Sequence, residues 1–142
     1  MSDRLPDADL VELFLNGHCA AYAIAAARAL AKAGATGVGI SILIDEEGEP
    51  NTQDDRCVIH AYASCDRLDY DAEGPRSPDE MADGYGLNAY DVDGPFSETD
   101  FLAFFCGPAD EHDGLEADPQ WIAAAEDLIA RRPDLIAPEN AS

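Results

Sequence analysis

The sequence is short of basic residues, and this shortage excludes several classes of protein. It holds 8 lysine and arginine residues against 30 acidic ones, for a formal net charge of −22. Such a field repels phosphates and anionic lipid headgroups and attracts basic partners, so direct nucleic-acid or membrane binding is not expected. Three explanations of the acidity stay open: solubility or salt adaptation, a basic protein or peptide as substrate or partner, and mimicry of nucleic acid toward a protein that binds it.

The sequence also lacks a long apolar run and a paired cysteine motif. Its opening residues contain no apolar signal-peptide core, and its longest mostly apolar stretch, residues 19–33, is too short to span a membrane. None of the four cysteines stands in a CxxC pair, so the spacing indicates neither a zinc ribbon nor a dithiol redox motif. We therefore expect a cytoplasmic protein with reduced thiols, no metal and no cofactor.

The residues that are present predict one α+β domain covering residues 1–142. Of the 142 residues, 46% are hydrophobic, which is enough for one folded core, and the chain is too short for two ordinary domains. Hydrophobic periodicity divides the chain into a helical part at 10–34, an antiparallel sheet at 37–74, covering helices at 97–132 and a frayed tail at 138–142. The individual elements are expected as helices at 7–15, 19–33, 97–107 and 119–131, and as strands at 37–44, 57–63 and 68–72.

Three residues carry the predicted chemistry: Cys19, His60 and Asp71. Cys19 stands at the expected N-terminus of a buried helix, where free backbone N–H groups and the helix dipole stabilise a thiolate and a developing oxyanion. His60 lies on an expected strand, where a rigid backbone can hold it as general base and acid. If residues 66–67 form a two-residue turn, Tyr62 lies opposite Asp71, which brings Asp71 within reach of the His60 ring.

The segments around these residues resemble the papain-like cysteine hydrolase superfamily, in particular its compact bacterial NlpC/P60-like and transglutaminase-like branches. The resemblance rests on residues 16–23, 59–62 and 69–74 and covers roughly the first half of the chain. It implies a papain-like fold, with the cysteine-bearing helix packed on a small antiparallel sheet of three or more strands. It also implies that the thiol attacks an acyl carbon, that the imidazole shuttles the proton and that the carboxylate orients the imidazole.

The expected function is therefore thiol-dependent acyl transfer, by a hydrolase or transferase acting on amide, isopeptide or thioester bonds. Asn16, His18 and Tyr62 are the candidates for substrate contact or oxyanion stabilisation. Two non-catalytic alternatives remain: an acidic protein that blocks a basic or nucleic-acid-binding partner, and a papain-like scaffold that has lost its activity. Zinc binding by His18 together with Cys19, His60 and Asp71 is a further alternative, although no recognised ligand spacing supports it.

Overall fold

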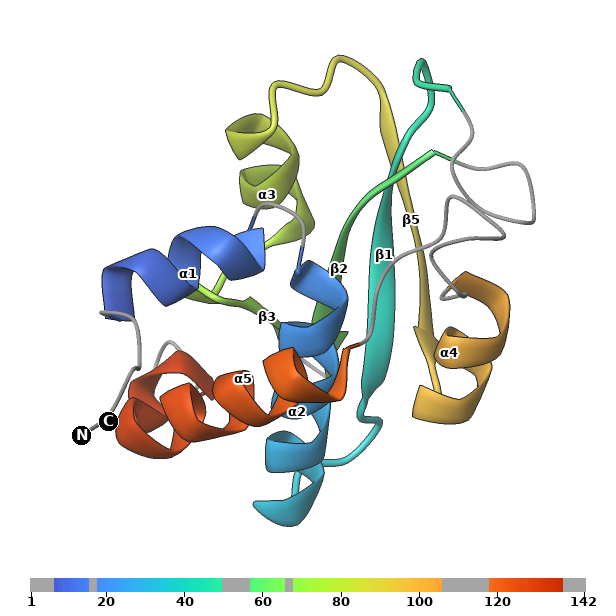
Figure 1. Ribbon diagram of the computed structural model, residues 1–142. Helices are drawn as coiled ribbons and strands as arrows, with labels where there is room; N and C mark the ends of the chain where they lie inside the picture. The colour runs from blue at the N-terminus through green and yellow to red at the C-terminus, as the bar shows by residue number, and fades with distance from the viewer. Residues whose placement is uncertain (1–6, 16–17, 50–56, 66–67, 106–117, 137–142) are drawn as a thin grey trace.

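Five helices and a five-stranded antiparallel sheet form the described part of the chain and confirm the expected α+β class (Figure 1). The computed structural model describes residues 7–15, 18–49, 57–65, 68–105 and 118–136, so the expected turn at 66–67 and tail at 138–142 lie outside the described residues. The helices are α1 (Asp7–Leu15), α2 (Cys19–Lys32), α3 (Pro78–Gly84), α4 (Glu98–Phe105) and α5 (Pro119–Arg131), followed by a short 3₁₀-helix (Pro133–Ile136). The strands are β1 (Gly39–Asp45), β2 (Val58–Ser64), β3 (Asp69–Asp71), β4 (Gly74–Pro75) and β5 (Tyr90–Phe96).

Helix α2 is the central helix, and its sequence explains why it can be buried. Small alanine side chains recur around it, so the helix contacts the sheet on one side and α5 on the other. Tyr22, Ile24 and Leu30 fill the remaining space and are each at most 4% exposed. Helix α5 crosses the outer side of α2, whereas α4 lies against β1 and β5 at the far end of the sheet (Figure 1).

The sheet has the strand order β4-β3-β2-β1-β5, and every neighbouring pair is antiparallel. Ala63 pairs with Tyr70 and Ser64 pairs with Asp69. This is the register that a two-residue turn predicts for the β2–β3 hairpin, and its continuation sets β3 against the middle of β2. Because a shift of one residue would turn every side chain to the other face, the register decides which residues can meet.

The two faces of the sheet have different coverings. One face contributes to the apolar core around α2 through Ile40, Ile42, Ala61 and Ala63. On the opposite face, Leu43 and Tyr62 pack against Met81 and Ala82 of α3. Strand alternation places the polar or ionisable residues of the sheet centre on this α3 face, namely Ser41, His60, Ser64, Asp69 and Asp71.

Residues 76–97, which sequence reasoning left unassigned, contain both α3 and β5. Helix α3 begins with a capping box, in which the Ser77 hydroxyl accepts the Glu80 N–H at 3.2 Å and the Glu80 carboxylate accepts the Ser77 N–H at 2.9 Å. Strand β5 forms one edge of the sheet and is largely exposed. Gly94 has a φ of +119°, and a Cβ there would lie 2.9 Å from Cα of Ser41, so glycine permits the close approach of β5 to β1.

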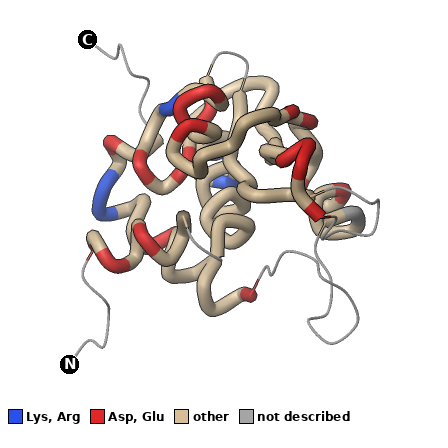
Figure 2. Tube along the Cα trace, turned by 90° about the horizontal axis from the view of Figure 1, so that it is seen from above, with Lys and Arg blue, Asp and Glu red and all other residues tan. Residues whose placement is uncertain are grey.

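Acidic residues are spread over the described surface, whereas the described arginines are held in ion pairs (Figure 2). Arg28 binds both carboxylate oxygens of Glu98, at 2.8 and 2.7 Å. Arg131 pairs with Asp7 and with Asp127. The described surface therefore keeps a large excess of negative charge. Within the described segments, no single helix is long and apolar enough to cross a membrane.

Candidate active site

The β2–β3 hairpin brings His60 and Asp71 into direct contact. The His60 Nε2 atom lies 3.2 Å from Oδ2 of Asp71, and both side chains are only 1% exposed. The contact follows from the register, since Asp71 lies at the end of β3 and on the same face as His60. The two-residue turn expected at 66–67 predicts this proximity through the same register.

The other ring nitrogen of His60 contacts a residue that sequence reasoning missed. The Tyr85 hydroxyl lies 3.1 Å from His60 Nδ1 and donates its proton to the carbonyl oxygen of Leu15. Burial, and then the charges of Cys19 and Asp71, raise the pKa of Tyr85 well above its usual range, so the phenol stays protonated. Tyr85 therefore links Leu15, at the C-terminal end of α1, to the His60 ring on β2.

The hydrogen bonds around His60 indicate which of its ring nitrogens carry protons. A carbonyl oxygen only accepts, so the single phenolic proton of Tyr85 is used on Leu15, and the phenol oxygen can only accept from Nδ1–H of His60. The Asp71 carboxylate likewise accepts from Nε2–H. This arrangement of acceptors around the ring fits a His60 that carries a proton on both nitrogens, that is, an imidazolium.

The electrostatics of the site agree with this assignment. Burial disfavours the charged ring, but the hydrogen bonds and charges of Asp71 and Cys19 outweigh that effect and raise the pKa of His60 from 6.5 to about 9. Cys19 is therefore one of the groups that raise the pKa of His60, after the hydrogen bond of Asp71. The structure thus brings His60 and Asp71 into hydrogen-bond contact.

Cys19 is the first residue of α2, as the sequence predicted. The first backbone N–H groups of a helix have no acceptor within it, and the preceding residue, His18, makes no side-chain capping hydrogen bond. The thiol consequently lies beside backbone donors and the positive end of the helix dipole. Cys19 is 5% exposed, so the described conformation covers it.

The Asp71 carboxylate accepts hydrogen bonds from two residues besides His60. Its Oδ1 accepts the Glu73 N–H at 2.9 Å, and its Oδ2 also accepts from Arg76 at 3.1 Å. Arg76 is held in turn by Glu73 at 2.9 Å and by the carbonyl oxygen of Glu80 at 3.1 Å. These bonds fix the position of the carboxylate, and the Arg76 guanidinium compensates its buried charge.

The other predicted site residues lie apart from this cluster or beside it. Tyr62 is 2% exposed, and its ring stacks on that of His60 with centroids 6.2 Å apart. The His18 ring lies against Trp121 of α5, with centroids 4.7 Å apart, and its buried Nδ1 has no hydrogen-bond partner among the described residues. Asn16 lies outside the described residues, so its expected oxyanion role stays a prediction.

Tyr85 and Arg76 come from the segment that received no assignment. The capping box at Ser77 and Glu80 was a readable signal for α3, and recognising it would have placed Tyr85 at the end of a helix. Nothing local in the sequence indicated that the side chains of Tyr85 and Arg76 reach the hairpin. Both contacts depend on how α3 packs on the sheet.

A cavity of about 280 Å³ lies next to the cluster. It is lined by Leu15, Glu73, Arg76, Met81, Gly84 and Tyr85. Two of its walls are therefore the side chains that contact His60 and Asp71. Among the described residues, no group of three or more His, Cys, Asp or Glu side chains is arranged to hold a metal ion, so the zinc alternative finds no support there.

Comparisons with protein-family models, curated proteins and solved structures were made on the whole chain. None of them finds a match.

Proposed function

We propose that this protein is a thiol-dependent acyl-transfer enzyme that hydrolyses or exchanges an amide, isopeptide or thioester bond. The observation that carries the proposal is the buried contact of 3.2 Å between His60 Nε2 and Asp71, with Cys19 at the start of a buried helix among the groups that raise the pKa of His60. A thiolate and an imidazolium in contact are the reactive form of a cysteine nucleophile. The resemblance of the same residues to the papain-like superfamily supports the proposal.

Each residue has a defined role in the reaction. The Cys19 thiolate attacks the acyl carbon, a C–S bond forms, and the negative charge moves to the carbonyl oxygen, where backbone N–H groups of the first turn of α2 stabilise it. The bond to the leaving group then breaks as His60 gives that group its proton, which leaves a thioester. Water or an amine attacks the thioester, His60 takes the proton of this nucleophile, and the thiolate is released. Asp71 keeps the ring oriented in both steps.

Access to the thiol requires a local movement, because Cys19 is 5% exposed and the Tyr85 hydroxyl occupies the hydrogen-bonding position at His60 Nδ1. Rotation of the Tyr85 side chain would free Nδ1 and join the neighbouring 280 Å³ cavity to the ring. Tyr85 follows directly after α3, a helix of 7 residues, so such a movement disturbs only a short element. Tyr85 is thus a positioning residue that holds the resting imidazolium in place.

The test is acylation by p-nitrophenyl acetate, a small activated ester. The wild-type protein should release nitrophenolate in a burst and gain one acetyl group on Cys19, detected by mass spectrometry of the intact protein and its peptides. Cys19→Ala should remove the burst and leave the circular-dichroism spectrum unchanged. Cys57→Ala is the matched control, because Cys57 is a half-buried thiol outside the cluster and burial raises its pKa, so this variant should keep the burst.

Two results would reject acyl transfer. One is a burst that persists in Cys19→Ala, and the other is acetylation of Cys57 or Cys65 as fast as that of Cys19. In either case the non-enzymatic hypothesis, an acidic protein that blocks a basic partner, would account for the fold and the charge without using the buried cluster.

A further inference from the structure

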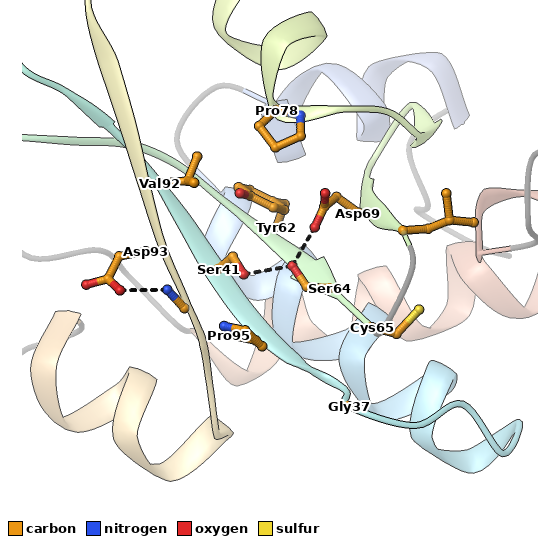
Figure 3. Close-up of a pocket in the computed structure, with 12 residues that line it drawn as sticks. Gly37, Ser41, Tyr62, Ser64, Cys65, Asp69, Pro78, Val92, Asp93 and Pro95 are labelled. Carbon is orange, nitrogen blue, oxygen red and sulfur yellow. Dashed lines mark hydrogen bonds between the residues drawn. The ribbon is translucent and has the colours of Figure 1, made fainter.

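A second and larger cavity opens on the α3 face of the sheet, about 510 Å³ in volume (Figure 3). Ser41 of β1 and Ser64 of β2 form its polar floor, and Asp69 of β3 lies beside them. Tyr62 also lines the cavity, and Val92 of the edge strand β5 forms part of its outer wall. None of the described residues that line it is basic.

Two serine hydroxyl groups in this cavity form hydrogen bonds that run in one direction. Ser64 donates its proton to Oδ1 of Asp69 at 2.8 Å, so it can only accept from Ser41, whose hydroxyl lies 2.7 Å away. Both dipoles therefore point toward the Asp69 carboxylate. Within the described part of the chain, Oδ2 of Asp69 receives no hydrogen bond, which leaves it available to a ligand.

The charges around the cavity favour a cation as that ligand. Burial raises the pKa of Asp69, and the hydrogen bond from Ser64 offsets this only in part, so the carboxylate has lost hydration without gaining a counter-ion among the described residues. Asp93 of β5 also lines the cavity, but its carboxylate points away from Ser41 and Tyr62 and accepts the Gly94 N–H at 2.8 Å (Figure 3). A positively charged group inside the cavity would recover the electrostatic energy that burial removes from Asp69.

The walls suit the aliphatic part of a long basic side chain. Val92 is 40% exposed, although it is a large hydrophobic residue, and it lines the cavity together with Leu68, Pro78 and Pro95. Lysine and arginine bury their methylene stems against apolar surface while the charged end finds a polar partner.

The position of the cavity relates it to the candidate active site. Tyr62 lines the cavity and stacks on His60, with 6.2 Å between ring centroids. From His60 to Ser64 the chain advances roughly 13 Å along β2, at about 3.3 Å per residue. An extended peptide covers that distance with about four residues. The cavity and His60 therefore lie on the same face of the sheet, and the part of that face between them is covered by Met81 and Ala82 of α3.

We propose that this cavity binds the lysine or arginine side chain of a peptide, with the Asp69 carboxylate as its counter-ion. The binding stands by itself, whereas its role in choosing basic peptide substrates rests on the proposed acyl transfer. The net charge of −22 would bring such peptides to the surface, and the cavity would select the side chain.

The test measures binding of Nα-acetyl-arginine methylamide by calorimetry or by amide chemical shifts in NMR. Nα-acetyl-citrulline methylamide is the neutral probe of nearly the same shape. Asp69→Asn should weaken binding of the arginine probe about tenfold to a hundredfold, which corresponds to the loss of one charge-assisted hydrogen bond. The asparagine carbonyl can still accept from Ser64, so the fold should be retained. Asp127→Asn removes the same charge from the exposed surface of α5 and should leave the affinity unchanged.

Several results would overturn the inference. They are equal affinity for the arginine and citrulline probes, unchanged affinity in Asp69→Asn, and an equal loss in Asp69→Asn and Asp127→Asn, which would reveal only the general field of the protein. The same titration on Cys19→Ala separates this inference from the proposed function. Binding that persists in Cys19→Ala supports the cavity whether or not the ester burst is observed, and a burst without arginine binding leaves acyl transfer standing while the cavity proposal fails.

Discussion

The charge on His60 makes a prediction about how the stability of the fold depends on pH. Its pKa of about 9 in the folded protein lies above the value of 6.5 for an unperturbed ring. Below pH 6.5 the ring is protonated in both the folded and the unfolded chain, and its full contribution to stability is present. Between pH 6.5 and about 9 the unfolded ring loses its proton while the folded ring keeps it, so stability falls as the pH rises. Above about pH 9 the contribution is gone.

The expected size of the effect is large for a domain of this length. A tenfold change in a proton-binding constant is worth about 1.4 kcal/mol, so the displacement of the His60 pKa corresponds to about 3 kcal/mol. Domains are stable by about 5–15 kcal/mol in total, so the loss of one proton from this ring would remove a substantial part of that margin.

The assay is urea unfolding of the wild-type protein and His60→Gln at a series of pH values from about 6 to about 10. Glutamine is uncharged throughout, and other titrating groups contribute similarly to both proteins, so the difference between the two curves isolates the ring. That difference should be largest at the acid end and shrink as the pH rises toward 9. Two curves that stay parallel over the whole range would refute the assignment of His60 as a buried imidazolium.

Two further predictions concern the partners of the ring. Tyr85→Phe removes the acceptor of Nδ1–H and the donor to Leu15, so it should lower the free energy of unfolding by about 1–3 kcal/mol and lower the His60 pKa, measured by urea unfolding and by NMR titration of the ring. Asp71→Asn removes the main stabilising charge and should lower the His60 pKa and slow the ester burst by roughly 100-fold or more. Asp100→Asn, on the first turn of α4, is the matched control, and a similar loss in that variant would contradict the role of Asp71.

The parts of the fold that the sequence predicted are those that depend on local chemistry. Helix α2 begins at Cys19 because the alanine-rich run starts there, and α5 follows Asp118, whose side chain accepts the Gln120 N–H at 2.9 Å. The β2–β3 register followed from the length of one turn, and it correctly brought His60 to Asp71.

The parts that the sequence did not predict depend on tertiary contacts or on weak periodicity. Strand β5 is exposed along most of its length and contains Gly94-Pro95, so it shows no alternation of burial and resembles a turn. Tyr85 reaches His60 from 25 residues away, and its phenol is useful there only because α3 packs over that face of the sheet. The near-complete burial of the Cys19 thiol likewise follows from packing and is not encoded in the helix-start motif.

The two edge strands of the sheet affect how the protein behaves at high concentration. An open sheet offers unused backbone donors and acceptors along its outer strands, and these can recruit another chain into aggregates. Here one outer strand, β4, is only two residues long and lies against the 3₁₀-helix. The other, β5, presents Asp91 and Asp93 and contains Pro95, which has no N–H to donate. A second copy of the chain that approached β5 would be repelled by the two aspartates and could not form a continuous series of backbone hydrogen bonds past Pro95. Both features therefore disfavour extension of the sheet by another strand.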